Sequence, residues 1–411
     1  MRKTVFNVIK KYYLNKTYLN HSLANIDHKD INKITLRVYG IIENKLYLEY
    51  LVNETTSRKK LDLNTQIIIM MSIYELLFID TPLHVVISEM QKLTKSVNPK
   101  SLKYISFYLH NLLPSKLITP HFSNEDKNLS IIYSIPQPII KLLKQQYPDC
   151  YLDIIKHQNK KTYVRIINDQ LIAPELLTNT QFNDLKICNT NINQNPDFIN
   201  HNLVVQDLGA YLVTKLLAPQ ASDKILDVCA APGNKTLHIY KYCQNVFANE
   251  LHEHRYNKMQ KHFANYHANI KCTNFDATSK EFIDYYQNES FVKILVDAPC
   301  SGLGVIHSKP EIKYQITPQT INSVIETQRQ ILTNVWPLLK PGGVLVYATC
   351  SINKQENEDN IDWFKTQVDC SIIDSETLEN LNIFNKKGYI LLPYTYQSDG
   401  FYMVGLKKNN R

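Results

Sequence analysis

The 411-residue chain is poor in glycine, and Gly40 is the only glycine before residue 209. Glycine supplies the backbone conformations of tight hairpins, so an extensive antiparallel sheet is disfavoured in the first half. Long apolar runs are also missing. The most apolar stretch, residues 67–79, contains Glu75 and falls short of the ~20 residues that span a bilayer. We expect a core helix there, and no membrane segment.

The cysteines lack the spacing of a metal site or a disulfide scaffold. The chain has eight cysteines, and none forms a CxxC pair, which disfavours zinc and secreted disulfide frameworks. The basic N-terminus "MRKTVFNVIKKYYLNK" is not followed by the apolar stretch of a signal peptide. We therefore expect a cytoplasmic protein with reduced thiols and no metal. Five cysteines are interpreted as small buried hydrophobic residues: Cys150, Cys188, Cys243, Cys272 and Cys370.

The net charge of +8 lies entirely in the N-terminal third. Residues 1–120 hold 17 basic and 9 acidic residues, whereas the remainder holds 29 of each. One interpretation is an electrostatic footprint for nucleic acid. The other is a solubilising surface, which is a commoner cause of a modest excess.

Periodicity divides the chain into three parts. Apolar residues recur at three and four through residues 1–118, which predicts an all-α domain. Residues 119–202 combine a short amphipathic helix with a strand, "KTYVRIIN", and predict a small α+β linker module. From residue 203, short β-branched runs alternate with helical patterns, which predicts an α/β Rossmann-like domain over 203–411. The last run, "GFYMVGLKK", is expected to be an edge strand.

The first strand of the third part leads into a turn of small residues. The segment "KILDVCAAPGNKTLH" predicts a strand over 224–228 and a helix that begins near Lys235. Ligands of open α/β sheets bind outside the carboxyl ends of the strands, where small residues let them approach the backbone. The loop lacks GxGxxG, which argues against a dinucleotide. An ordinary βα loop is the alternative interpretation.

Acidic residues end the next three predicted strands: Glu250, Asp276 and Asp297. A carboxylate at the end of the second strand can accept from both ribose hydroxyls of an adenosine, and Asp276 could accept from an adenine amino group. Each acid alone would be interpreted as a solvated loop residue. Three carboxylates at one edge fit a nucleoside better than a diphosphate, because they would repel phosphate.

Two strands end in cysteine motifs. "DAPCSGLGV" at 297–305 contains Cys300, and "YATCS" at 347–351 contains Cys350. A parallel sheet brings the ends of neighbouring strands together. The two thiols are therefore expected to flank one bound group.

Taken together, these motifs resemble the RNA cytosine-5 methyltransferases, and most closely the RsmB/Sun (Fmu) family that acts on 16S rRNA. "CAAPGNKT" at 229–236 is similar to the family's cofactor loop, and the two cysteine segments are similar to its two cysteine motifs. "VQD" at 205–207, "LKPGG" at 339–343 and "DGFYM" at 399–403 fit its flanking segments. The helical N-terminus, through "DTPLHVVISEMQKLTK" at 80–95, is similar to the RNA-binding domain of NusB.

The resemblance implies a class I methyltransferase domain that uses S-adenosylmethionine, with small-subunit ribosomal RNA as partner and a monomeric chain. It implies that Cys350 is the nucleophile toward C6 of cytosine and that Cys300 assists release. It also implies that Asp297 binds or protonates N3, and that Lys235 positions the base or cofactor and lowers a thiol pKa. The implied cofactor-binding residues are Cys229, Ala230, Ala231, Pro232, Gly233, Asn234, Lys235, Glu250, Asp276 and Asp297.

The sequence departs from the family pattern at three places. Asn234 stands where a second glycine is usual, and we expect asparagine to tolerate a left-handed backbone there. Glu250 replaces a usual aspartate. After Cys300 the family's basic run is replaced by "HSKPEIKY" at 307–314, where His307 and Lys309 keep part of the charge. These differences predict weaker RNA contact rather than different chemistry.

Three alternatives stay open from the sequence. The first is an RNA-binding or ribosome-assembly factor that keeps a methyltransferase fold without catalysis. The second is a dinucleotide-dependent oxidoreductase. The third is a methyltransferase of transfer RNA or protein-coding RNA.

Overall fold

The computed structural model describes residues 1–24, 26–56, 61–112, 120–157, 160–168, 170–383 and 387–410. By their internal packing, these residues form two compact units. The first comprises residues 1–156 together with 309–316, and the second comprises residues 157–308 and 317–411. The predicted division at residues 118 and 202 remains a prediction.

The first unit is helical in its described residues, as the periodicity predicts. Helix α5 carries the most apolar run and is buried along most of its length. Its Glu75 is 1 % exposed and pairs with Arg2 at 2.7 Å and with Arg37 at 3.1 Å, so the buried carboxylate is compensated by two guanidinium groups. The helices are α1 (Arg2–Asn15), α2 (Leu19–Leu23), α3 (Ile31–Glu43), α4 (Lys45–Thr55), α5 (Leu63–Leu77), α6 (Leu83–Val97), α7 (Leu102–Asn111), α8 (Glu125–Ile132), α9 (Gln137–Gln146) and α10 (Tyr151–Lys156).

Residues 309–316 pack into this helical unit although they follow the Cys300 loop in the chain. The Lys313 ammonium donates to the Glu43 carbonyl at 2.8 Å, and the Tyr314 hydroxyl lies 3.0 Å from the Ile42 carbonyl. Burial lowers the pKa of Lys313 to about 7. Lys313 and Tyr314 belong to the segment that replaces the family's basic run. Both are therefore engaged in contacts within the helical unit.

The second unit begins with a small antiparallel sheet in the order β2-β3-β1-β4. The predicted strand "KTYVRIIN" forms β1, which pairs with β3 and β4. The elements are β1 (Thr162–Ile166), β2 (Leu177–Asn179), β3 (Leu185–Cys188), β4 (Leu203–Val205) and the short helix α11 (Pro196–Ile199).

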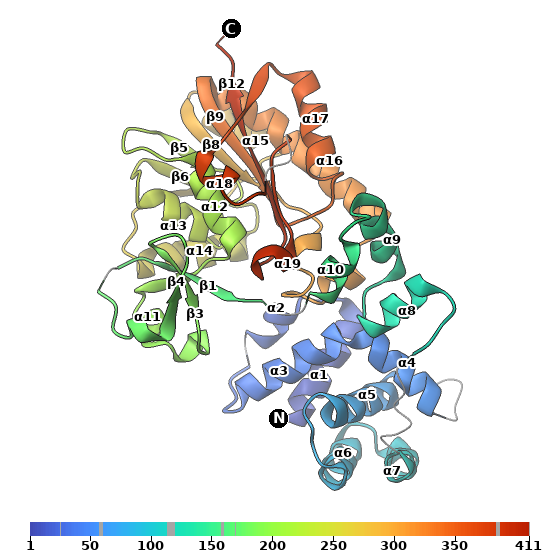
Figure 1. Cartoon of the computed structure of the whole chain (residues 1–411). Coiled ribbons are helices and arrows are strands. Elements are labelled where there is room, and N and C mark those ends of the chain that lie inside the picture. Colours follow the sequence, from blue (N-terminus) through green and yellow to red (C-terminus); the bar gives the residue numbers. More distant parts are fainter. Residues whose placement is uncertain are drawn as a thin grey trace. The chain divides into compact units, whose positions relative to one another are not determined.

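The larger sheet of this unit has eight strands in the order β10-β12-β9-β8-β5-β6-β7, with β11 paired to β12 (Figure 1). Strands β9, β8, β5, β6 and β7 are parallel, whereas β12 is antiparallel to β9, β10 and β11. The strands are β5 (Ile225–Asp227), β6 (Val246–Asn249), β7 (Lys271–Thr273), β8 (Phe291–Asp297), β9 (Leu339–Thr349), β10 (Cys370–Ile373), β11 (Tyr389–Leu391) and β12 (Phe401–Lys408).

Helices cover both faces of this sheet, because successive strand residues point to opposite sides. Ile225 and Leu295 pack with helices α12 and α13, whereas Leu226 and Val296 pack with α15, α16 and α17. The Rossmann-like prediction is confirmed. The helices are α12 (Leu208–Leu217), α13 (Asn234–Tyr240), α14 (Glu253–Asn265), α15 (Lys280–Tyr286), α16 (Pro318–Val335), α17 (Glu358–Gln367), α18 (Glu376–Glu379) and α19 (Pro393–Tyr396).

The prediction that "GFYMVGLKK" forms an edge strand is wrong. This segment is β12, which lies between β9 and β10 and is buried from Phe401 to Leu406. The short strand β10 lies at the edge instead. A run that is apolar at successive positions packs on both faces of a sheet, so it belongs in the interior.

Within the described residues, no helix is both long and apolar enough to cross a bilayer.

Candidate functional site

The candidate site is built at the carboxyl edge of the parallel strands. Asp227 ends β5, Asp297 ends β8, and Glu250 and Cys350 directly follow β6 and β9. The chain reverses its strand order on the two sides of β5, which pairs with β6 on one side and β8 on the other. Such a switch point leaves a crevice where ligands of α/β sheets bind.

The loop at residues 229–236, called the cofactor loop after its predicted role, turns sharply at Gly233, whose φ is +106°. A Cβ at this position would lie 2.5 Å from the Phe263 ring, so both the conformation and the space require glycine. The expectation of a left-handed Asn234 is wrong, because Asn234 is the first residue of helix α13. The residue with the left-handed backbone conformation is Gly233, one position earlier.

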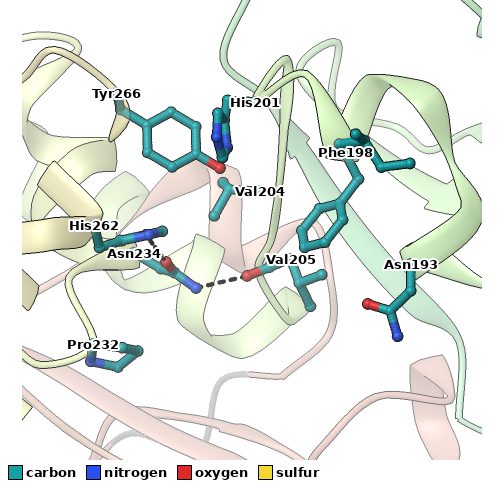
Figure 2. A pocket seen from close by; sticks show the side chains of 10 residues that line it. Asn193, Phe198, His201, Val204, Val205, Pro232, Asn234, His262 and Tyr266 are labelled. Atoms are coloured by element: carbon teal, nitrogen blue, oxygen red, sulfur yellow. Dashed lines mark hydrogen bonds between the residues drawn. The ribbon is translucent and has the colours of Figure 1, made fainter. Parts of the chain in front are cut away.

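Asn234 forms hydrogen bonds with residues of three other elements. Its amide nitrogen donates to the Val205 carbonyl of β4 at 2.8 Å, and its Oδ1 accepts from His262 of α14 at 2.7 Å (Figure 2). Its carbonyl lies 3.4 Å from the Arg165 guanidinium of β1. An asparagine at the usual glycine position therefore fastens the loop to the small sheet.

The side chain of Glu250 is buried, with only 2 % of it exposed. One carboxylate oxygen accepts from the His252 backbone N–H at 3.0 Å and lies 3.3 Å from Arg255. Arg255 in turn donates to the Ala231 carbonyl at 2.6 Å. The ion pair thus links the second strand to the cofactor loop.

Asp276 lies three residues beyond β7 and is exposed. Its Oδ1 accepts from the backbone N–H and the hydroxyl of Thr278, at 2.8 and 2.7 Å. These two hydrogen bonds fix the orientation of the exposed carboxylate.

Lys235 and Asp297 form an ion pair at 2.7 Å. Burial lowers the pKa of Lys235, but Asp297, Asp227 and Cys350 outweigh that effect, so this pKa is raised above its ordinary value. The ammonium is therefore charged at neutral pH. By reciprocity, it stabilises negative charge on Cys350.

The thiols of Cys300 and Cys350 are in contact, with their Sγ atoms 3.3 Å apart. The contact with Cys350 and burial both raise the pKa of Cys300 well above its ordinary value. One thiol of such a pair can be a thiolate while the other remains protonated and donates to it. No disulfide is formed by any of the eight cysteines, all of which are described.

A buried carboxylate joins the two cysteine loops. Glu356 is 0 % exposed and accepts from the Ser301 backbone N–H at 2.7 Å, the Ser301 hydroxyl at 2.5 Å and the Ser351 hydroxyl at 2.8 Å. Asn353 donates to the same carboxylate at 3.2 Å. Since each serine directly follows a cysteine, Glu356 fixes both cysteines through their neighbours.

Asp227 is a site residue that the sequence interpretation missed. It is 1 % exposed, and its Oδ2 accepts from the Thr236 hydroxyl at 2.7 Å. Its Oδ1 is buried and has no hydrogen-bond partner among the described residues. Burial raises its pKa from 3.8 to about 7, against the Thr236 hydrogen bond and with the help of Asp297. The available signal was its position at the end of the first strand, directly before the cofactor loop.

Lys160 forms ion pairs with aspartates of two flanking motifs that are far apart in the sequence. Lys160 lies 3.2 Å from Asp207 of "VQD" and 2.5 Å from Asp399 of "DGFYM". Burial raises the pKa of Asp207 to about 6, although Lys160 lowers it. This cluster joins the start of the small sheet to the segment that leads into β12.

The remaining predicted residues lie in the loop or in the core. Ala230 and Ala231 are each 6 % exposed, and Pro232 is exposed. Cys229 is half-buried, and burial raises its pKa well above the ordinary value, in keeping with a packing role. Among the described residues, no group of three His, Cys, Asp or Glu side chains could hold a metal ion.

Comparison with known proteins identifies the family. The sequence profile of the family "16S rRNA methyltransferase RsmB/F" matches residues 214–407. A ribosomal RNA small subunit methyltransferase B from Shewanella oneidensis is 32% identical over 352 residues, which are 82% of this chain and 80% of the relative. The chain belongs to the ribosomal RNA small subunit methyltransferase B family.

The similarity to members of this family extends over nearly the whole chain. The methyltransferase B of Vibrio cholerae is 29% identical over 426 residues, covering 95% of this chain and 94% of the relative. The NusB family profile matches residues 1–107, which confirms the predicted likeness of the helical N-terminus.

Solved structures share the fold. The crystal structure of PH0851 superposes with a TM-score of 0.80 at 22% identity, over 99% of both chains. A methyltransferase homologue from Pyrococcus horikoshii gives a TM-score of 0.58 at 20% identity, over 70% of this chain and 100% of that one. Membership in the methyltransferase B family argues against the dinucleotide-dependent oxidoreductase.

Proposed function

We propose that this protein transfers a methyl group from S-adenosylmethionine to C5 of a cytosine in small-subunit (16S) ribosomal RNA, through a covalent bond between Cys350 and C6. The contact of the Cys300 and Cys350 thiols beside the Lys235–Asp297 ion pair carries this proposal. The family membership supports ribosomal RNA over transfer RNA or protein-coding RNA as the substrate.

The acidic edge fits S-adenosylmethionine, which carries positive charge on its sulfonium and amino groups. Glu250 would accept from the ribose hydroxyls and Asp276 from the adenine amino group. Asp227 lies at the same edge, at the end of β5, and its buried Oδ1 has no hydrogen-bond partner among the described residues. Alanine and glycine at 230, 231 and 233 leave room for the ligand at the backbone. When bound, S-adenosylmethionine supplies the methyl group as an electrophile.

Cys350 begins the reaction, because C5 of cytosine is a weak nucleophile until a group adds at C6. The Cys350 thiolate forms a bond to C6, and the electron pair of the C5–C6 double bond becomes available at C5. Lys235 favours the thiolate form of Cys350 through its positive charge. The base has to leave its stack to reach the thiols at the ends of the strands.

Asp297 and Cys300 act on the adduct. Asp297 hydrogen-bonds to or protonates N3 of the ring, where negative charge develops. A proton for N3 is supplied through Asp297 by the Lys235 ammonium, 2.7 Å away. After C5 has gained the methyl group, Cys300 assists removal of the C5 proton. The C5–C6 double bond re-forms, and Cys350 leaves C6 as a thiolate. Cys300 and Cys350 therefore have separate roles, although they lie in contact.

The helical unit supports binding of RNA by this protein. Its sequence holds the whole excess of positive charge, and its match to the NusB family covers residues 1–107. We propose that this monomeric, cytoplasmic protein uses the helical unit to bind ribosomal RNA while the second unit performs methyl transfer. The exposed lysines would contact phosphates.

Bisulfite sequencing of ribosomal RNA from cells with and without this gene tests the proposal. One 5-methylcytosine of the small-subunit RNA should disappear without the gene and return with the wild-type gene. It should not return with Cys350→Ala. If all 5-methylcytosines of the small-subunit RNA persist, the ribosomal assignment is wrong. A non-catalytic assembly role would leave methylation unchanged in both strains.

A further inference from the structure

A pocket of about 400 Å³ lies in the second unit, beside the cofactor loop. Figure 2 shows Phe198 and Val205 on one side of the pocket, and His262 and Tyr266 on the other. The first pair belongs to the segment of the small sheet, and the second pair to helix α14 and the residue that follows it. Pro232 and Asn234 of the cofactor loop also line the pocket, but none of the lining residues has a role in the catalytic steps proposed above.

The pocket continues into the candidate active site. Val205, Pro232 and Asn234 line both this pocket and a neighbouring cavity of about 110 Å³. The smaller cavity is also lined by Lys235 and Asp297, the ion pair next to the cysteines. A polymer with one unit beside Lys235 and Asp297 therefore has an adjoining pocket on its path.

The walls suit a flat, neutral ring. Tyr266 makes edge contacts with His201 at 5.4 Å and with His262 at 5.0 Å between ring centroids, and Phe198 faces this group across the pocket (Figure 2). Burial lowers the pKa of His262, which keeps its ring uncharged at neutral pH. None of the described residues that line the pocket carries a carboxylate, unlike the acidic edge proposed for the cofactor.

Two exposed apolar side chains belong to the lining of the same pocket. The side chains of Ile199 and Val205, both in the pocket lining, are 59% and 38% exposed. Two large apolar side chains exposed next to aromatic rings are typical of a binding surface.

Helix α14, which contributes His262 to the pocket, contains more basic than acidic residues. Helix α14 contains Arg255, Lys258 and Lys261, whereas Glu253 is its only acid. Lys258 is exposed and precedes His262 by four residues, so both lie on the same face of the helix. A ligand with a neutral ring in the pocket and an anionic group outside would meet both features.

We propose that this pocket receives an unpaired base of the substrate RNA next to the nucleotide whose base enters the active site. The base stacks against Phe198 and Tyr266, and its phosphate faces Lys258. Unpaired RNA bases are bound in this way, by stacking on aromatic side chains beside basic residues. The proposal rests on the proposed function for the identity of the nucleotide whose base lies beside Lys235 and Asp297.

Fluorescence titration of the full chain with single-stranded RNA tests the pocket. The probe is a 15-nucleotide RNA with one cytidine, and 2-aminopurine replaces the base on either side in turn. One of the two positions should be quenched on binding to the wild type and to Phe198→Tyr, but not to Phe198→Ala. An abasic residue at that position should weaken wild-type binding by about 5- to 150-fold, and should have little effect on Phe198→Ala.

Tyr242→Ala is the matched control, because Tyr242 is an exposed aromatic residue of the same unit outside the pocket. It should behave like the wild type in every titration. Absence of coupling between Phe198→Ala and the abasic residue at both positions would overturn the proposal. Weaker calorimetric binding of S-adenosylmethionine to Phe198→Ala, with RNA binding unchanged, would assign the pocket to the cofactor and overturn it as well.

Methyl transfer to small-subunit RNA by the wild type separates this proposal from the function. If the wild type methylates the RNA without coupling at Phe198, the pocket proposal fails alone. If coupling is found but no RNA cytosine is methylated, the catalytic proposal fails while the pocket still binds a base.

Discussion

The Sγ atoms of Cys300 and Cys350 lie 3.3 Å apart, although the two residues are 50 positions apart in the chain. The parallel pairing of β8 with β9 aligns Asp297 with Ala348, so the two loops that follow these strands emerge side by side. The contact gives each thiol a partner for proton transfer. Substitution of each cysteine in turn can separate their proposed roles.

Alanine variants of the two cysteines should fail at different steps. Cys350→Ala should bind RNA and S-adenosylmethionine but give neither methyl transfer nor a covalent complex. Cys300→Ala should accumulate an RNA–protein adduct that carries label from the methyl donor and survives denaturing electrophoresis. The double variant should behave like Cys350→Ala, because an adduct that cannot form cannot accumulate.

Two outcomes would change this assignment. An adduct that accumulates in Cys350→Ala would exchange the roles of the two cysteines. If neither single variant blocks turnover or traps RNA, the covalent mechanism is wrong.

Glu356→Gln should slow methyl transfer without changing cofactor affinity. The amide cannot accept from all the groups that converge on the carboxylate, and hydrogen bonds to a charged group contribute about 1.5–3 kcal/mol each. We expect kcat to fall at least about tenfold with an unchanged Kd for S-adenosylmethionine. Kinetics and calorimetry measure the two quantities.

Glu326→Gln serves as the control for Glu356→Gln, because Glu326 is exposed on α16. A normal kcat in Glu356→Gln would show that the cysteine loops hold their positions without this carboxylate.

Glu250→Ala should weaken binding of S-adenosylmethionine, because the carboxylate can accept two charge-assisted hydrogen bonds from the ribose. Even one such bond corresponds to about tenfold in Kd, and calorimetry checks it. Glu253→Gln, an exposed change on α14, is the control. Since Glu250 also pairs with Arg255, the melting temperature of each variant should be measured in parallel. Unaltered affinity in a folded Glu250→Ala protein would reject Glu250 as the ribose ligand.

Asp227→Asn should stabilise the protein increasingly as pH rises. Burial raises the pKa of Asp227 from 3.8 to about 7, so ionisation opposes folding. The contribution of the protonated carboxyl is complete below pH ~4 and is lost as pH rises through about 7. At 1.36 kcal/mol per pKa unit, the difference approaches roughly 4 kcal/mol above pH 7.

Urea unfolding of wild type and Asp227→Asn at several values between pH 5 and 8 measures this difference. The exposed Asp276→Asn is the matched control. A stability difference that stays constant over this range would contradict a raised pKa at Asp227.

Replacing exposed lysines of the helical unit by glutamine should reduce the salt dependence of RNA binding. Lys3, Lys11, Lys100 and Lys103 are exposed. If all four contact phosphates, the slope of log K against log salt should fall by up to about 3. Four exposed lysines of the second unit provide a control with the same change of charge: Lys271, Lys280, Lys340 and Lys365. Equal effects of the two sets would show that the footprint does not lie in the helical unit.

Local sequence determined much of the second unit. The strand at β5, the turn at Gly233 and the helix after it follow from β-branched residues, a glycine and a helical period, all within 15 residues. The carboxyl edge followed as well, because parallel strands with helical crossovers end on the same side. Glu250, Asp297 and both cysteines could therefore be found before the fold was known.

Tertiary structure alone decided the relationships that depend on distant residues. Burial raises the pKa of Asp227, and the nearby charge of Asp297 raises it further. No local pattern encodes either effect. Strand β12 lies inside the sheet because β10 pairs with it on the side away from β9. The tie from Asn234 to Val205 and His262 joins three segments through side-chain hydrogen bonds. Such contacts form only when the chain has folded, since their partners are set by packing and not by sequence spacing.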